Sequence, residues 1–133
     1  MGTPLDDVYR NFFARVDENM SGKESLVYAI FIIAISKARK NVRHSLSYTL
    51  TDDEKYEGYF TETLDDDEID LLALHMLYEC TRRKLQKLVA QRDDIGTPDF
   101  NRLPGKKEQL AVVESAMKTT KDDIISLTNE FFY

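Results

Sequence analysis

Residue types on which many functional sites depend are scarce in this chain. Its 133 residues include no tryptophan, one cysteine and two histidines. The single Cys80 excludes an internal disulfide and is typical of a protein from a reducing compartment. His44 and His75 lie far apart without HxxxH spacing, and Cys80 is not part of a CxxC pair. We therefore expect no metal site, no cofactor site and no catalytic cysteine.

The chain also lacks a long hydrophobic run and an excess of positive charge. Its longest apolar run, Leu26–Ile35, is too short to span a bilayer. The first residues match neither a signal peptide nor the usual myristoylation context. Lys and Arg number 18 against 24 Asp and Glu, for a formal net charge of −6. This balance argues against a general nucleic-acid or membrane-surface binder, so we expect a soluble protein without membrane contact.

Hydrophobic periodicity predicts a mainly α fold. Residues 1–133 suit a single helical domain, since 32% charged and 42% hydrophobic residues lie in the globular range. Helical spacing predicts a helix ending near Asn19, a second after Ser21, a long one over Asp65–Arg92 and a last one from about Lys106. The expected architecture is a four-helix bundle-like domain with a small β-hairpin between helices two and three.

The hairpin is expected at about 45–63, where the hydrophobic period changes to two. Ser45–Thr51 alternates polar and apolar residues, and the aromatic, threonine-rich stretch Tyr56–Thr63 follows a polar turn at Asp52–Lys55. Gly58 is a candidate β-bulge. A lone hairpin is marginal in water, so we expect it to pack on the helices or on a neighbouring subunit.

Polar residues are predicted to cap three helix starts. Thr3 precedes Pro4, which suits a first helical position. Ser21 and Asp65 are each followed three residues later by a glutamate, the spacing of a capping box.

The stretch Asp65–Arg92 is expected to organise the fold. It is acidic at its start and basic at its end, and apolar on two stripes as far as Cys80. We therefore predict a buried spine up to Cys80 that continues as a surface arm. A loop pinned by Phe100 and Leu103 should follow.

The last helix is predicted from a narrow apolar stripe that covers the bundle from one side. Its members are Leu110, Val113, Met117, Thr120, Ile124, Leu127 and Phe131. The chain then ends in an aromatic tail at 129–133, for which we consider core packing and a partner subunit's groove.

The acidic segment Asp52–Asp70 has no spacing typical of a calcium loop, and spacing alone supports no catalytic acid pair. The plain interpretation is turn and helix-cap chemistry. The alternative is an acidic surface that docks a basic protein or mimics DNA. The basic cluster of Arg82, Arg83, Lys84, Lys87 and Arg92 could contact nucleic acid, but such an arm on an acidic protein more often meets an acidic protein partner or simply water.

Short pieces across the chain resemble a family of small structural proteins of tailed bacteriophages and prophages of Gram-positive bacteria. The pieces are Thr3–Phe13, Leu64–Ala73 followed by Met76 and Glu79, Asp99–Phe100 and Glu130–Tyr133. The resemblance implies a virion component assembled in the bacterial host cytoplasm. Its expected function is that of a head–tail connector, or adaptor, forming a ring between portal and tail that assists head completion and DNA retention.

The resemblance also implies the partners. The first partner is the chain itself, in a ring that is dodecameric in the family. The others are the portal protein and a tail-side connector or tail terminator protein. DNA would pass through the channel without sequence-specific binding. Opposite charges on adjacent edges would suit a ring. The interaction residues expected on this hypothesis are Asp65, Asp66, Asp67, Arg82, Arg83, Lys84, Lys87, Phe131, Phe132 and Tyr133.

A second function from another class stays open. The chain would then be an acidic, phage-encoded regulatory protein that inhibits a host nucleic-acid enzyme, with Asp52–Asp70 mimicking phosphates. No matched acid, base and nucleophile is evident, so we expect no enzymatic activity.

Overall fold

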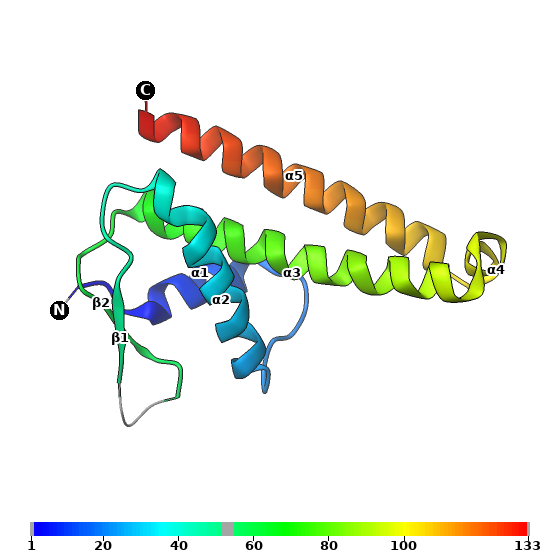
Figure 1. Ribbon diagram of the computed structural model, residues 1–133, viewed down its shortest axis with the longest axis horizontal. Helices are drawn as coiled ribbons and strands as arrows, with labels where there is room; N and C mark the ends of the chain where they lie inside the picture. Colours follow the sequence, from blue (N-terminus) through cyan, green and yellow to red (C-terminus); the bar gives the residue numbers. More distant parts are fainter. Residues whose placement is uncertain (1, 52–54, 133) are drawn as a thin grey trace.

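The computed structural model describes residues 2–51 and 55–132 and is mainly helical (Figure 1). The predicted bundle-like fold with a hairpin between helices two and three is confirmed, and the short helix α4 stands where a loop was predicted. The elements are α1 (Leu5–Arg15), α2 (Glu24–Ala38), the 3-10 turn η1 (Arg39–Asn41), β1 (Tyr48–Leu50), β2 (Gly58–Phe60), α3 (Asp66–Ile95), α4 (Thr97–Arg102) and α5 (Lys106–Phe132).

Helix α3 is the spine of the molecule. Its 30 residues form a rod about 45 Å long, and α1, α2 and α5 all pack against it. Figure 1 shows α5 running back along α3 after the turn at α4. The buried side chains of α3 are concentrated between Glu68 and Thr81, and Leu88 alone is buried beyond them. The predicted change from buried spine to surface arm is therefore confirmed.

The core lies where α1, α2 and β2 meet the first half of α3. Phe12, Phe31 and Phe60 are fully buried there, one from each of the three elements. The ring centroid of Phe31 lies 5.3 Å from that of Tyr9 in an edge-to-face arrangement. Truncating any of the three phenylalanines to alanine should cost about 3–5 kcal/mol, because each would leave a cavity.

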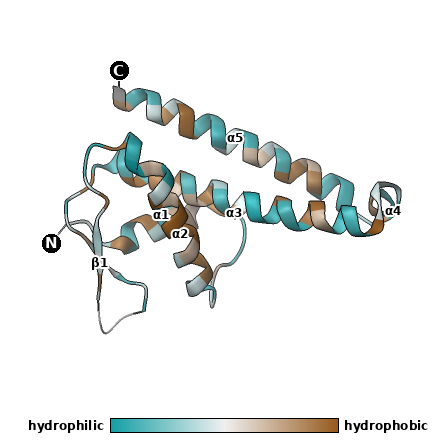
Figure 2. Ribbon diagram, viewed as in Figure 1, coloured by the Kyte–Doolittle hydropathy of each residue, from teal (hydrophilic) through white to brown (hydrophobic). Residues whose placement is uncertain are grey.

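Helix α2 is apolar all round but is buried on one side only. Figure 2 shows hydrophobic residues along much of its length. Val27, Phe31 and Ala34 are buried against the core, whereas Leu26 is 36% exposed and Ile32 45% exposed. The outer side of α2 therefore leaves an apolar surface.

The hairpin is shorter than predicted, and residues 52–54 of the predicted turn at Asp52–Lys55 lie outside the described residues. Leu50 pairs with Gly58 in a regular antiparallel register, so the candidate bulge at Gly58 was wrong. Glycine is required there for another reason: a Cβ on Gly58 would clash with the backbone carbonyl oxygen of Thr49.

The first residues extend the hairpin on its other side. The backbone N–H of Gly2 donates to the carbonyl of Phe60 at 3.0 Å, and Phe60 N–H donates to the carbonyl of Thr3 at 2.8 Å. This pairing turns the Thr3 hydroxyl toward Leu64, whose N–H it accepts at 2.8 Å. Thr3 therefore does not cap α1, and Pro4 precedes the helix in an extended conformation.

One predicted capping box is confirmed and the other is wrong. Asp65 and Glu68 make both reciprocal contacts at the start of α3. Gly22 adopts a φ of +75°, and the N–H of Lys23 donates to the carbonyl of Met20 at 3.1 Å. Ser21 therefore lies inside a turn, and α2 begins only at Glu24 without a side-chain cap.

The far end of the arm is closed by α4. Phe100 is fully buried, as predicted, but Leu103 is 42% exposed, so its predicted anchoring role was wrong. Helix α5 continues through the predicted aromatic tail to Phe132, and Phe131 packs against the core. All members of the predicted α5 stripe are at least half-buried: Leu110, Val113, Met117, Thr120, Ile124, Leu127 and Phe131.

Candidate protein-interaction site

The acidic end of α3, Asp65–Asp67, is built around the buried carboxylate of Glu68. One oxygen of Glu68 accepts the backbone N–H groups of Arg43 and His44, each at 2.9 Å. The other accepts the Asp65 N–H at 2.9 Å and contacts Nδ1 of His44 at 2.6 Å. Glu68 thus fastens the loop after η1 to the start of α3.

These contacts shift the acidity of both side chains. Burial alone would raise the pKa of Glu68, but hydrogen bonds from Asp65 and His44 lower it below its usual value. The hydrogen bond to Glu68 raises the pKa of His44, and nearby Asp65 adds to this effect. The pair therefore favours a charged imidazolium beside a charged carboxylate.

Arg43 joins the acidic end of α3 to the last turn of α5. Its guanidinium contacts Asp65 at 2.8 Å and Asp67 at 3.0 Å. It also lies 4.9 Å from the ring centroid of Phe131, in cation–π geometry. Three of the predicted interaction residues, Asp65, Asp67 and Phe131, are therefore brought together by a residue that the sequence did not single out.

The acidic end also contains a group with metal-ligand composition. One ligand atom from each of His44, Asp65 and Glu68 lies within 4.8 Å of the others. Both oxygens of Glu68 already accept hydrogen bonds, and Asp65 is engaged by Arg43. A metal would have to displace these donors, so the group fits a structural junction better than a metal site.

Three of the four predicted basic residues, Arg83, Lys84 and Lys87, line a groove between α2 and α3, here called the basic groove. Its volume is about 390 Å³. Leu26 and Ile30 of α2 form part of its apolar wall. Its cations are Lys23, Arg83, Lys84 and Lys87, and Glu18 is its acid. Arg82 points to a different groove, between α2, α3 and α5.

Most of the basic side chains already have partners in the chain. Arg82 pairs with Glu79 at 2.6 Å, and Arg83 contacts the same carboxylate at 3.4 Å. Lys84 contacts Glu18 at 3.2 Å. Within residues 2–51 and 55–132, Lys87 and Asp66 make no ion pair. Among the described residues, Lys87 in the basic groove and Asp66 at the acidic end are therefore free to form an ion pair with a partner.

Cys80 lies at the basic groove as a protonated thiol. Burial and a hydrogen bond to Glu18 raise the pKa of Cys80 to about 11. The thiol donates to Glu18 at 3.4 Å, which helps to position that carboxylate. A thiolate is the nucleophilic form of cysteine, so this environment disfavours nucleophilic chemistry.

His75 lies in the groove that Arg82 lines. Its Nε2 atom is buried and has no hydrogen-bond partner. Among the described side chains, no other buried nitrogen or oxygen atom lacks one. Burial, together with Lys37, lowers the pKa of His75 to about 4, so the ring is neutral at pH 7. Leaving such an atom unpaired costs about 1–3 kcal/mol.

The structure thus separates the predicted interaction residues into two places. The acidic end and the basic residues from Arg82 onward lie roughly 25 Å apart along α3. Tyr133 and the side chain of Phe132 lie outside the described residues. The sequence singled out the apolar run Leu26–Ile35 as a candidate subunit interface, but it did not place Leu26 or Lys23 beside the basic residues of α3. They come from another part of the chain and join the basic groove only through tertiary packing.

Comparisons with protein-family models, curated proteins and solved structures find no match to this chain. Among the described residues, none of the helices combines the length and the apolar character needed to cross a bilayer.

Proposed function

We propose that the chain is a structural protein of a phage virion, a head–tail connector whose copies form a ring between portal and tail. The ring would assist head completion and retain the packaged DNA. The observation that carries the proposal is the basic groove with its apolar wall, set apart on the same helix from the acidic end. Two different surfaces of opposite charge on one subunit suit a head-to-tail contact between identical copies.

The ring contact joins the acidic end of one copy to the basic groove of the next. A contact between two different surfaces of identical subunits closes into a ring when the rotation between copies permits. Asp66 and Lys87 supply the main attraction, because their charges are not neutralised by ion pairs with other described residues. Leu26, which is 36% exposed, supplies apolar surface that the contact removes from water.

The overall charge of the chain suits a channel for DNA. With a formal net charge of −6, a ring of many copies carries a large negative charge. A negative inner wall repels the DNA backbone, so DNA passes without binding. The portal protein and a tail-side protein would occupy the two open faces of the ring.

Charge reversal at the two available residues tests the ring contact. Lys87→Glu and Asp66→Lys should each abolish assembly in size-exclusion chromatography with light scattering, with and without the cognate portal as template. Mixing the two variants should restore assembly in rings of alternating copies. One contact then pairs the two introduced side chains, lysine at position 66 with glutamate at position 87, and the next contact pairs the native Asp66 with the native Lys87. Lys107→Glu on exposed α5 is the matched control and should assemble normally.

Two results would contradict the proposal in different ways. A wild-type chain that stays monomeric even with the portal would remove the connector function. Assembly of Lys87→Glu at the wild-type level would leave the connector function standing but remove the basic groove from the interface. Helical circular dichroism of every variant shows that the subunit is folded.

A further inference from the structure

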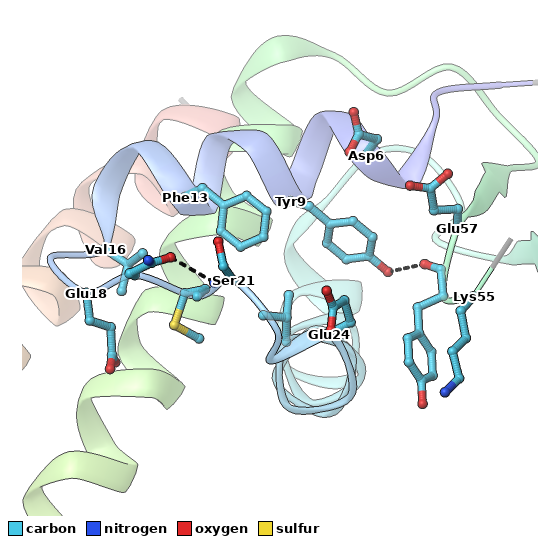
Figure 3. A pocket seen from close by; sticks show the side chains of 13 residues that line it. Asp6, Tyr9, Phe13, Val16, Glu18, Ser21, Glu24, Lys55 and Glu57 are labelled. Atoms are coloured by element: carbon cyan, nitrogen blue, oxygen red, sulfur yellow. Dashed lines mark hydrogen bonds between the residues drawn. The ribbon is translucent and has the colours of Figure 1, made fainter.

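A second concave site, the aromatic pocket, lies between α1, α2 and the residues that lead into β2 (Figure 3). Its volume is about 500 Å³, within the range of ligand pockets. Tyr9 and Phe13 come from α1, and Tyr56 comes from the segment before β2. Glu18 lines both this pocket and the basic groove, whereas the other lining residues belong to neither the basic groove nor the acidic end.

The aromatic walls are held in a defined geometry. The hydroxyl of Tyr9 donates to the backbone carbonyl of Tyr56 at 2.7 Å, which Figure 3 shows as a dashed line. The ring of Tyr56 stacks on that of Tyr28, with centroids 4.8 Å apart. Phe13 is 45% exposed, so one ring of the pocket remains available to an occupant.

Four carboxylates and one ammonium line the pocket: Asp6, Glu18, Glu24, Glu57 and Lys55. Asp6 already pairs with Arg10, and Glu18 pairs with Lys23 and Lys84. Glu24 makes no ion pair among the described residues. The ammonium of Lys55 lies 5.7 Å from the ring centroid of Tyr56, so a cation already stands over one aromatic wall.

We propose that the aromatic pocket binds an arginine side chain presented by a peptide segment of a partner protein. A guanidinium stacks on aromatic faces and pairs with carboxylates through a planar set of donors. The pocket supplies both complements, with Phe13 and Tyr56 as faces and Glu24 as an available carboxylate. The remaining volume accommodates the apolar residues next to the arginine. The pocket shares Glu18 with the basic groove, but it does not include Asp66, Lys87 or Leu26, which form the proposed ring contact.

The occupant displaces Lys55 from the face of Tyr56. Lys55 is exposed and contributes the positive charge that competes with an incoming guanidinium. Replacing it with methionine keeps much of the apolar side chain and removes the charge. Binding should therefore become tighter in Lys55→Met and weaker in Glu24→Gln. A nonspecific acidic surface would respond to the loss of any carboxylate, so a distant carboxylate on α5 serves as the control.

A peptide titration tests the proposal. The probe is acetyl-Ala-Leu-Arg-Leu-Ala-amide, and the control peptide carries citrulline, the neutral analogue of arginine. In two-dimensional amide NMR spectra the arginine peptide should shift the signals of Phe13, Met20 and Val27. The citrulline peptide should bind about tenfold more weakly, which corresponds to about 1.4 kcal/mol.

The variants complete the test. Glu24→Gln should weaken arginine-peptide binding about threefold, an effect of the size of one partly exposed charge pair. Lys55→Met should strengthen it, and Glu114→Gln on distant α5 should change nothing. Equal binding of the two peptides, or shifts confined to other surfaces, would overturn the proposal. A third result would also overturn the proposal: the arginine peptide does not bind, and Glu24→Gln loses self-association. The pocket would then bind a second copy of the chain.

Discussion

Nδ1 of His44 lies 2.6 Å from the buried carboxylate of Glu68, so a side chain from the loop after η1 closes the start of the central helix. Glu68 would be costly to bury as a charged group without partners. Its two backbone donors from residues 43 and 44 and one from Asp65 complete its hydrogen bonding. The stability of the chain should therefore depend on the charge state of this pair.

The first prediction concerns pH. Because the pKa of His44 is raised in the folded state, its contact with Glu68 adds to the free energy of unfolding. This contribution is complete below about pH 6.5 and is lost as the pH rises through the folded-state pKa of His44. The lowered pKa of Glu68 also adds to the free energy of unfolding. This contribution is present above about pH 4.3 and is lost as the pH falls through the folded-state pKa of Glu68. Through this pair, stability should be greatest between about pH 4.5 and 6.5.

Urea unfolding at a series of pH values measures this dependence. His44→Gln cannot become charged, so its free energy of unfolding should decline less than that of the wild type as pH rises from about 6 to about 9. Parallel curves for the two proteins over this range would show that the His44–Glu68 contact is not ionic.

The second prediction concerns Arg43 and Phe131, which lie 4.9 Å apart from guanidinium carbon to ring centroid. Phe131→Leu keeps an apolar side chain but removes the aromatic face, and should cost about 0.5–1 kcal/mol. In an Arg43→Gln background the same change should cost less, because the cation is gone. A double-mutant cycle by urea unfolding gives the coupling energy, and purely additive effects would refute a direct contact.

The third prediction concerns Thr3, which is 6% exposed and accepts the N–H of Leu64. Thr3→Val preserves the shape but leaves that buried donor unpaired, so the free energy of unfolding should fall by about 1–3 kcal/mol. The matched control is Thr49→Val on exposed β1, where valine suits a strand and should be close to neutral. Equal effects at both positions would mean that the Thr3 hydrogen bond adds nothing.

These residues show how far the sequence could predict the structure. The Asp65–Glu68 capping box and the α5 stripe depend on spacing within one helix, so both were predictable. The partners of Glu68 come from residues 43 and 44, and no local pattern indicates that this loop returns to α3. Thr3 had a plausible local role as a cap, but pairing of residues 2–4 with β2 overrode it.

The same reasoning applies to the candidate site. The basic residues of α3 were visible as a cluster in the sequence. That Arg83, Lys84 and Lys87 share a groove with Lys23, whereas Arg82 lies elsewhere, depends on where α2 crosses α3. The internal pairing of Arg83 with Glu79 follows from their i, i+4 spacing and could have been anticipated.

The fourth prediction concerns salt and follows from the proposed ring contact. Raising NaCl from about 0.05 M to about 0.5 M shortens the Debye length to a few ångströms, which should weaken assembly at least about tenfold. Lys87→Glu should lose most of this salt dependence together with its assembly. Sedimentation velocity at several salt concentrations measures both effects. Assembly that strengthens with salt would indicate an interface dominated by apolar contacts.

The arm of α3 has a mechanical consequence. Beyond Thr81 the helix continues to Ile95, and α4 and α5 accompany it to the end. This part of the rod is about 20 Å long, so a tilt of about 10° at the body moves its tip by roughly 3–4 Å. A small tilt where the arm leaves the body is thus amplified into a larger displacement at α4.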